Sequence, residues 1–294
     1  MDIVCHMITS LDGCILLERW SKPAERVDFT QVYEATAKRL QGDGWIVGRI
    51  TMAEYGQGVV EGEPAGMRGR GESVPRAYVG DRQDRPLAVV FDPKGRLQFS
   101  KNGLPTGEHV VAVLDPKIDE AHLARLRRAG VSYVFQGDGA ECTEREKLSA
   151  ALAALEETFG VKRLLLEGGG VLNGSFLAAG LIKEISVLVC PTVDGRSESA
   201  KLFSWAGSEE LSPAEGVRLK LLEAEPLVNG VVWLHYLNTL AWRTDDLAKQ
   251  AAVQLNQNCG RFVRALARSA QSVKGLKDYL RSASRKLKPP SLSE

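Results

Sequence analysis

The chain has 294 residues, of which 44% are hydrophobic and 26% are charged, and its formal net charge is +1. This composition predicts one large domain or two small ones with a real hydrophobic core, and it argues against nucleic-acid binding over the whole surface. No apolar run approaches the roughly 18 residues of a membrane span, no signal peptide opens the sequence, and the cysteines form no Cys-x-x-Cys pair. We therefore expect a cytoplasmic protein without a membrane segment, a metal site or a disulfide scaffold.

The first predicted strand covers residues 2–8 and ends in the turn Thr9-Ser-Leu-Asp-Gly13. Ser10 and Asp12 are ordinary turn formers, but they can also project polar groups into a cleft at the carboxyl end of the strand, where open α/β sheets bind ligands. Trp20 follows in a polar loop, either as a lid over a ligand or as a packed surface residue. Apolar residues at helical spacing then predict a helix over residues 29–40.

The stretch Trp45-Ile-Val-Gly-Arg-Ile-Thr51 predicts a buried strand, a glycine turn and a helix that Thr51 caps. Arg49 stands at the start of this helix, where a cation and free main-chain N–H groups come together. This arrangement suits a phosphate, such as the 2′-phosphate of NADPH. The alternative is an ordinary capped helix with a solvated arginine.

Residues 56–85 are rich in Gly, Pro and Arg and show no period, so we expect a long loop of a kind that is functional or disordered. Beyond it, strands alternate with helices. Strands are predicted over residues 87–91, 109–114 and 131–135, and helices over 119–129 and 144–159. This alternation predicts a mostly parallel sheet with helices on both faces.

The stretch from Arg163 to Gly180 predicts a strand, a glycine turn and a helix. Leu164, Leu165 and Leu166 form the apolar run of a strand that is buried on both faces. The three glycines that follow let the backbone approach a ligand closely, and the next helix directs its N–H groups toward that gap, which suits a pyrophosphate. The alternative is that the glycines only let the strand and the helix pack tightly.

A strand is predicted over residues 182–189, and a hairpin joins residues 219–222 and 231–237 around Asn229-Gly230. Residues 239–294 hold 11 Lys or Arg and 4 Asp or Glu, a net charge of +7, which leaves −6 for the rest of the chain. We expect helices in this tail. Its basic face either touches nucleic acid or membrane or is simply solvated, and we prefer the solvated helical appendage. The domains are therefore residues 1–237 and a basic helical extension over 238–294.

Three stretches, taken together in this order, carry a family resemblance: Thr9-Ser-Leu-Asp-Gly13, Gly48-Arg-Ile-Thr51, and Glu167-Gly-Gly-Gly170 with Gly180-Leu-Ile-Lys-Glu-Ile-Ser-Val-Leu-Val-Cys-Pro191. Over about residues 1–237 the chain resembles the reductase domain of the bifunctional riboflavin-biosynthesis deaminase–reductase. The resemblance implies an α/β, dihydrofolate-reductase-like fold, with a mostly parallel sheet, helices on both faces and a C-terminal antiparallel hairpin. It also implies a homodimer.

The resemblance implies an NADPH-dependent reductase that transfers a hydride from nicotinamide C4 to C1′ of the ribosyl group of 5-amino-6-(5-phosphoribosylamino)uracil. The substrate would lie against Ser10, Asp12, Trp20 and Glu167, with Asp12 as the candidate for acid–base catalysis. Lys94 is a candidate partner of the 2′-phosphate. The other residues that the resemblance places at the cofactor are Ile8, Gly48, Arg49, Thr51, Gly168, Gly169, Gly170, Val171 and Leu172.

The sequence departs from the family pattern at two places, and the first of them puts the substrate in doubt more than the cofactor. Thr51 leads into Met52-Ala-Glu-Tyr55 where an Asp-x-Pro element is common, and Lys183 stands where Asp is usual. The zinc deaminase signature is absent. One alternative is a dihydrofolate reductase, whose buried acid on the first helix only Glu25, Asp28 or Glu34 would loosely replace. Another is a non-catalytic nucleotide-binding or partner-binding module that acts through the basic tail.

Overall fold

The computed structural model describes residues 1–56, 58–68, 76–137 and 142–240. Every described residue belongs to the first of the two units into which the chain divides, Met1–Ala248. The predicted extension over residues 238–294 therefore lies outside the described residues except for its first three. Its predicted helices and its basic face stay predictions.

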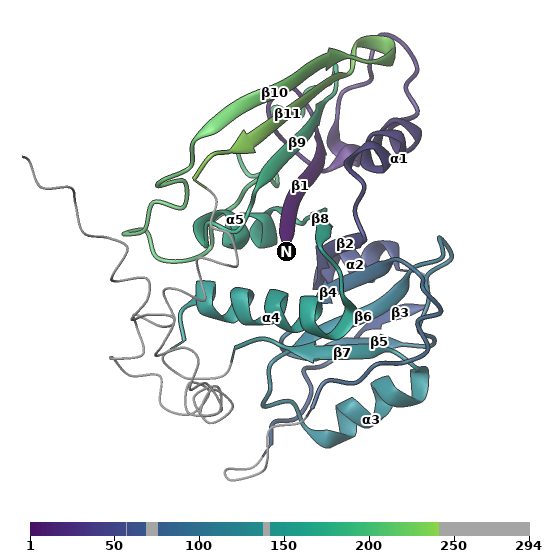
Figure 1. Cartoon of the computed structure of the whole chain (residues 1–294). Helices are drawn as coiled ribbons and strands as arrows, with labels where there is room; N and C mark the ends of the chain where they lie inside the picture. Colours follow the sequence, from purple (N-terminus) through teal and green to yellow (C-terminus); the bar gives the residue numbers. More distant parts are fainter. Residues whose placement is uncertain (57, 69–75, 138–141, 241–294) are drawn as a thin grey trace, which may run out of the picture. The chain divides into compact units, whose positions relative to one another are not determined.

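A single nine-stranded sheet organises the described part of the chain (Figure 1). From edge to edge the strands are β10 (Leu219–Pro226), β11 (Val232–Asn238), β9 (Glu184–Val189), β1 (Asp2–Thr9), β8 (Arg163–Leu166), β2 (Gly44–Gly48), β4 (Leu87–Phe91), β6 (His109–Leu114) and β7 (Ser132–Phe135). All pairs from β9 to β7 are parallel, whereas β11 runs antiparallel to both β9 and β10. The predicted parallel sheet with a C-terminal hairpin is confirmed.

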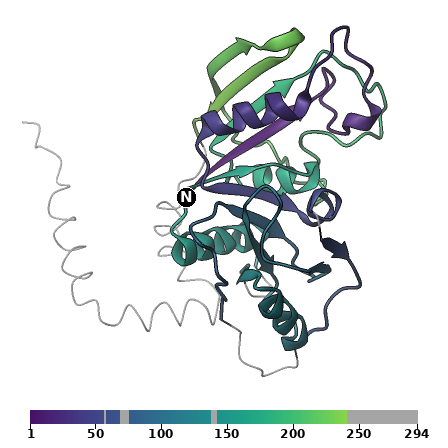
Figure 2. The same ribbon diagram turned by 90° about the vertical axis from the view of Figure 1, so that its right-hand side faces the viewer.

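Helices cover both faces of this sheet, as Figures 1 and 2 show from two sides. Leu164 and Leu166 of β8 pack on one face with α4 (Glu144–Phe159) and α5 (Gly170–Ala178). Leu165 points to the other face, where α1 (Phe29–Leu40) covers β1 and β9. The helices α2 (Arg49–Tyr55) and α3 (Glu120–Ala129) pack on that same face over β2, β4 and β6. The unbroken leucine run of β8 thus serves two cores at once.

Two local predictions are wrong. Thr51 does not cap α2, because this helix begins at Arg49 and has Gly48 as its N-cap. The segment 56–85 is also more structured than a loop, since β3 (Val59–Glu61) pairs with β5 (Leu97–Phe99) in a separate antiparallel ribbon. Strands of three residues are too short to show a period of two in the sequence.

The order of the strands determines where a ligand can bind. The connection from β8 to β9 passes over β1, whereas the connection from β2 leads to β4 on the other side. The chain therefore leaves the carboxyl ends of the neighbouring strands β8 and β2 in opposite directions. In open α/β sheets this switch point is where ligands bind.

Candidate functional site

The two glycine turns singled out in the sequence meet at this switch point. The main-chain N–H of Gly48, at the end of β2, donates a 2.7 Å hydrogen bond to the carbonyl oxygen of Gly168, which follows β8. The two strands are neighbours, with Ile46 paired to Leu166, so both turns leave the same edge of the sheet. Two of the three stretches that carry the family resemblance thereby form one surface.

Both helices that leave this surface begin without a side-chain cap. The N-caps of α2 and α5 are Gly48 and Gly169, neither of which offers a side-chain acceptor to the first turn. The first N–H groups of a helix have no intrahelical partner and carry partial positive charge. Ile50 and Val171, in the first turns of the two helices, are 65% and 55% exposed. The junction is therefore open, positively polarised and able to accept an anionic ligand.

The neighbouring glycines of the turn have different roles. A Cβ on Gly170 would collide with the carbonyl oxygen of Lys201, and the N–H of Ser204 donates to the carbonyl oxygen of Gly170 at 2.9 Å. Gly170 is therefore required for tight packing. A Cβ on Gly169 would meet only Thr51 Oγ1, at the ordinary distance of 3.6 Å. Tight packing therefore explains Gly170 but not Gly169, for which close approach of a ligand stays a prediction.

Asp12 is held as a carboxylate in the turn after β1. The Ser10 hydroxyl donates to Asp12 Oδ1 at 2.6 Å, and the main-chain N–H groups of Gly195 and Asp194 donate to its two oxygens at 2.8 and 3.1 Å. These hydrogen bonds, with that of Ser10 the largest contribution, lower the pKa of Asp12 well below its usual range. A group that stays ionised near neutral pH suits orientation of the turn and of a ligand better than proton transfer.

Glu167 has the opposite electrostatic character. It follows β8 directly, and burial raises the pKa of its carboxyl to about 8, an effect that the Tyr33 hydroxyl partly offsets and that the charge of Glu108 increases. Tyr33 is itself fixed by α1 and donates to the carbonyl oxygen of His6 at 2.9 Å. Glu167 therefore keeps its proton near neutral pH at the carboxyl end of a central strand. The family resemblance placed it near the substrate, whereas its raised pKa follows from burial in the folded chain.

The remaining predicted site residues surround the junction less closely. Trp20 packs edge to face on Phe29, with ring centroids 5.5 Å apart, and among the described residues its buried Nε1 has no acceptor. Ile8 is partly buried near the carboxyl end of β1. Lys94 is exposed in the turn after β4, where its carbonyl oxygen accepts from the N–H of Ala65. Ile8 and Trp20 both pack against the hydrophobic cluster beneath α1, whereas Lys94 belongs to a separate turn.

Arg49 is not a free cation, because its guanidinium forms an ion pair with Glu61 of β3. Arg96, in the turn between β4 and β5, approaches the same carboxylate at 3.6 Å. Sequence reasoning missed Glu61 and Arg96. A phosphate at Arg49, as predicted from the sequence, would therefore compete with Glu61 for the guanidinium.

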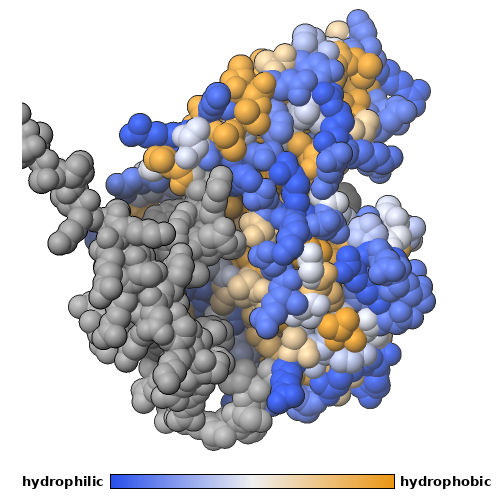
Figure 3. Space-filling view, in the orientation of Figure 1, coloured by the Kyte–Doolittle hydropathy of each residue, from blue (hydrophilic) through white to orange (hydrophobic). Residues whose placement is uncertain are grey.

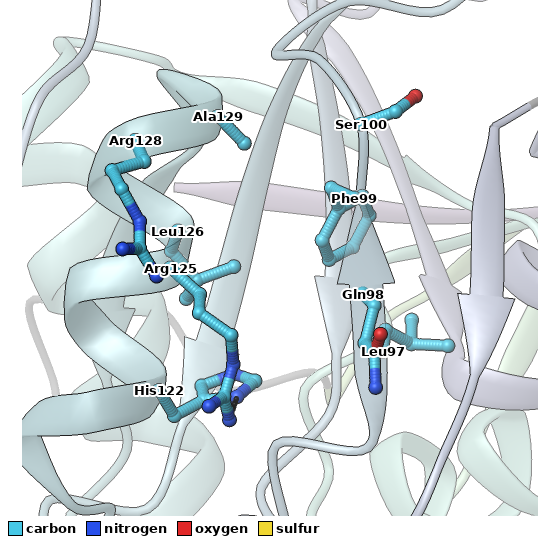
Figure 4. Close-up of a pocket in the computed structure, with 9 residues that line it drawn as sticks. All are labelled: Leu97, Gln98, Phe99, Ser100, His122, Arg125, Leu126, Arg128 and Ala129. Atoms are coloured by element: carbon cyan, nitrogen blue, oxygen red, sulfur yellow. Dashed lines mark hydrogen bonds between the residues drawn. The ribbon is translucent and has the colours of Figure 1, made fainter.

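A cavity of about 320 Å³ lies elsewhere, between α3 and β5 (Figure 4). None of the predicted site residues lines it. Its lining residues are Leu97, Gln98, Phe99, Ser100, His122, Arg125, Leu126, Arg128 and Ala129. In the part of the chain that the structure describes, no cluster of three or more His, Cys, Asp or Glu side chains is placed to hold a metal ion. Among the same residues, no helix has the length and apolarity needed to cross a membrane.

Comparison with known proteins gives one family and several relatives, two of which are described here. The family model described as the RibD C-terminal domain matches residues 2–233. A 2,5-diamino-6-ribosylamino-4(3H)-pyrimidinone 5′-phosphate reductase from Methanothermobacter thermautotrophicus is 30% identical over 138 residues, 47% of this chain and 60% of that protein. A protein of the same name from Archaeoglobus fulgidus is 29% identical over 118 residues, 40% of this chain and 51% of that protein. The matches thus span only 51–60% of these relatives.

Solved structures show the same fold. A pyrimidine reductase-like protein from Corynebacterium diphtheriae superposes with a TM-score of 0.56 at 19% identity, over 80% of this chain and 91% of that one. A RibD structure from Acinetobacter baumannii gives a TM-score of 0.52 at 20% identity, over 81% of this chain and 58% of that one. At these identities the likeness concerns the fold alone.

Proposed function

Because the chain belongs to the RibD C-terminal domain family, we propose that it is an NADPH-dependent reductase of a phosphorylated ribosylaminopyrimidine, as in riboflavin biosynthesis. The two archaeal relatives bear the name of a reductase of this kind. The observation that carries the proposal is the junction of the glycine turns, where Gly48 and Gly168 share a hydrogen bond and two uncapped helices begin. A dinucleotide needs such a surface for its pyrophosphate.

The residues at the junction fit such a cofactor. Gly169 is open on the ligand side, and the first-turn N–H groups of α5 supply donors without a competing side chain. The pyrophosphate would lie on the turn formed by Gly168–Leu172, and Gly48, Arg49 and Thr51 would hold the adenosine side. Ile8 would lie beside the nicotinamide, and Lys94 remains a candidate for the 2′-phosphate. When bound, the nicotinamide supplies the hydride.

We propose that Glu167, rather than Asp12, donates the proton that the reduction needs. Reduction of an opened ribosyl group adds a hydride at C1′ and a proton to the molecule. Glu167, with its pKa near 8, holds a proton at neutral pH and can donate it from its carboxyl oxygen. Asp12 stays ionised and fixes the loop at Asp194 and Gly195, so with Ser10 it would shape the substrate side. Trp20 would form a wall of the same side.

The alternatives are less well supported. A dihydrofolate reductase would need a buried acid on the first helix, whereas Glu25, Asp28 and Glu34 are all exposed. Asp28 moreover caps α1, accepting from the N–H of Gln31 at 3.0 Å. A module that acts through the basic tail depends on residues outside the described part of the chain. The reductase remains the proposal that the described residues favour.

The edge of the sheet supports the expected homodimer. β10 is an edge strand whose other side has no partner strand in the described part of the chain. Its Leu219, Leu221 and Leu222 are 47–50% exposed, and Figure 3 shows hydrophobic atoms gathered over β10 and β11. Exposed apolar edge strands tend to pair with another chain. A second copy pairing here would cover these leucines.

Turnover tests the proposed function. The purified full chain is mixed with NADPH and in turn with 5-amino-6-(5-phosphoribosylamino)uracil, its 2,5-diaminopyrimidinone counterpart and dihydrofolate, and loss of the nicotinamide absorbance is followed. We expect consumption of NADPH with a pyrimidine phosphate and a product heavier by two hydrogens. Turnover of dihydrofolate alone would favour the alternative enzyme, and no turnover with any of them would overturn the proposal.

A further inference from the structure

A three-residue charge cluster lies at the start of α2, made of Arg49, Glu61 and Arg96. The carboxylate oxygen Oε1 of Glu61 forms an ion pair with Arg49 Nη1 and lies 3.6 Å from Arg96 Nη1. One oxygen therefore bridges two guanidinium groups. Arginine is the side chain best suited to bind phosphate, and here two arginines are occupied by a carboxylate instead.

The fold gathers these side chains from three separate elements. Glu61 pairs with Leu97 across the β3–β5 ribbon, and the N–H of Gly62 donates to the carbonyl oxygen of Arg96 at 2.8 Å. Arg96 belongs to the turn that follows β4, and β4 lies beside β2, the strand that leads into Arg49. The cluster therefore lies beside the glycine junction, at the same carboxyl edge of the sheet.

The cluster has an unmatched positive charge. It contains two cations and one anion, and its side chains are 24%, 37% and 33% exposed for Arg49, Glu61 and Arg96. Nε of Arg96 is buried and finds no acceptor within the part of the chain that the structure describes. A second anion can therefore be attracted, but it must compete with Glu61 for the same donors.

We propose that Glu61 determines coenzyme selectivity, by competing with the 2′-phosphate of NADPH for Arg49 and Arg96 and by accepting a hydrogen bond from the 2′-hydroxyl of NADH. This inference rests on the proposed function, because it needs the adenosine half of the cofactor beside Arg49. An acidic residue near the ribose hydroxyl favours NAD, and an arginine favours NADP. This chain places both kinds of residue in contact, so the carboxylate limits the preference for NADPH that the arginines would otherwise give.

The competing explanation is a purely structural ion pair that ties β3 to α2. In that case, loss of Glu61 would lower the melting temperature. It would either weaken the binding of both coenzymes by a similar factor or leave the binding of both unchanged. The ratio of the two dissociation constants separates the explanations, because a structural ion pair has no means of distinguishing a phosphate from a hydroxyl.

The test is a calorimetric titration of the full chain with NADPH and with NADH, for the wild type, Glu61→Gln and Arg96→Gln. We expect Glu61→Gln to tighten NADPH binding by about tenfold, with NADH unchanged or weaker, and Arg96→Gln to weaken NADPH by about tenfold with little effect on NADH. Glu63→Gln is the matched control, because Glu63 is an exposed acid on the same segment. The ratio of the NADPH and NADH dissociation constants of this variant should equal that of the wild type.

Adenosine 2′,5′-bisphosphate and adenosine 5′-phosphate repeat the comparison without the nicotinamide half. If Glu61→Gln still binds both coenzymes with the wild-type ratio of dissociation constants, this inference is overturned and the proposed function stays intact. If neither coenzyme nor either adenosine phosphate binds the wild type, the proposed function fails and this inference fails with it.

Discussion

The 2.7 Å hydrogen bond from the N–H of Gly48 to the carbonyl oxygen of Gly168 joins two turns that are far apart in the sequence. It fixes the starting points of α2 and α5 relative to each other, because each turn is also the N-cap region of its helix. The N–H groups of two helices are thus held in place before any ligand arrives. Such preorganisation lowers the entropic cost of binding.

Glu167 should control the alkaline side of the activity profile. If the protonated carboxyl donates the proton, kcat should fall as the pH rises through about 8, where this group ionises. Glu167→Gln should lower kcat by about 100-fold or more, since a positioned general acid contributes on that order, and should remove this alkaline decline. Steady-state kinetics between pH 6 and about pH 9 measure both effects. An alkaline decline that survives in the variant would contradict the role.

Unfolding gives an independent check on Glu167. Its folded pKa is raised from the ordinary value of 4.5 to about 8, so between these values the folded state keeps a proton that the unfolded state has lost. Its contribution to stability is therefore fully present below pH 4.5 and is lost as the pH rises through 8. As the pH rises over this range, the melting temperature of the wild type should fall relative to that of Glu167→Gln. A constant difference would show that the carboxyl is not perturbed.

Asp12 should affect substrate binding rather than proton transfer. Its carboxylate accepts from Ser10, Asp194 and Gly195, so Asp12→Asn should loosen this turn and raise KM by about tenfold. Because its lowered pKa keeps it ionised throughout the working range, the pH dependence of kcat should keep the wild-type shape. Loss of the pH dependence in Asp12→Asn, but not in Glu167→Gln, would return the acid–base role to Asp12.

Glu184 should stabilise the sheet in a pH-dependent way. Burial alone would raise its pKa, but hydrogen bonds from His235 and from Arg163, at 2.9 and 2.6 Å, lower it to about 2. This stability is present above the unfolded value of 4.5 and is lost as the pH falls toward 2. Glu184→Gln should cost about 2 kcal/mol near neutral pH, because Arg163 and His235 lose their shared carboxylate. The loss should shrink in acid, as denaturant unfolding will show.

The edge strand predicts the oligomeric state. Leu221 on β10 is 50% exposed, so a lysine in its place should be tolerated by the monomer. If a second copy covers this edge, the wild type should have the mass of a dimer and Leu221→Lys should weaken the dimer by at least about tenfold. Light scattering over a dilution series measures this, with the exposed Lys220→Gln of the same strand as control. A monomeric wild type would contradict the homodimer.

Much of the fold follows from local sequence signals. Three leucines before three glycines predict β8, the turn and α5, because an apolar run marks a buried strand and glycine permits the turn. The departure at Lys183 also has a local explanation, since its ammonium forms an ion pair with Asp2 of the adjacent strand β1. These features depend on the residues of a segment and its immediate neighbours.

The details of the candidate site depend on contacts between distant segments. Glu61 lies in a three-residue strand without a readable period, so its ion pair with Arg49 could not be predicted. The raised pKa of Glu167 comes from burial in the folded chain and from the charge of Glu108, which is distant in the sequence. The meeting of Gly48 with Gly168 follows from the pairing of β2 with β8, which neither stretch encodes by itself. Register between distant strands is a global property of the fold.

Gly169 offers a substitution that should affect a ligand and not the fold. Its backbone has φ −66° and ψ 180°, which any residue adopts, and a Cβ there meets only Thr51 Oγ1 at 3.6 Å. Gly169→Ala should therefore melt within a few degrees of the wild type, and its methyl group should weaken dinucleotide binding by about tenfold or more. Gly170→Ala should instead lower the melting temperature strongly, because its methyl group collides with the Lys201 carbonyl.

The most direct test of the account is a titration of the wild type and Gly169→Ala with NADPH, followed by energy transfer from the tryptophans to the nicotinamide. We predict saturable binding to the wild type and at least about tenfold weaker binding to the variant, with equal melting temperatures. No binding to the wild type, or equal binding to both proteins, would contradict the claim that the glycine junction holds the cofactor.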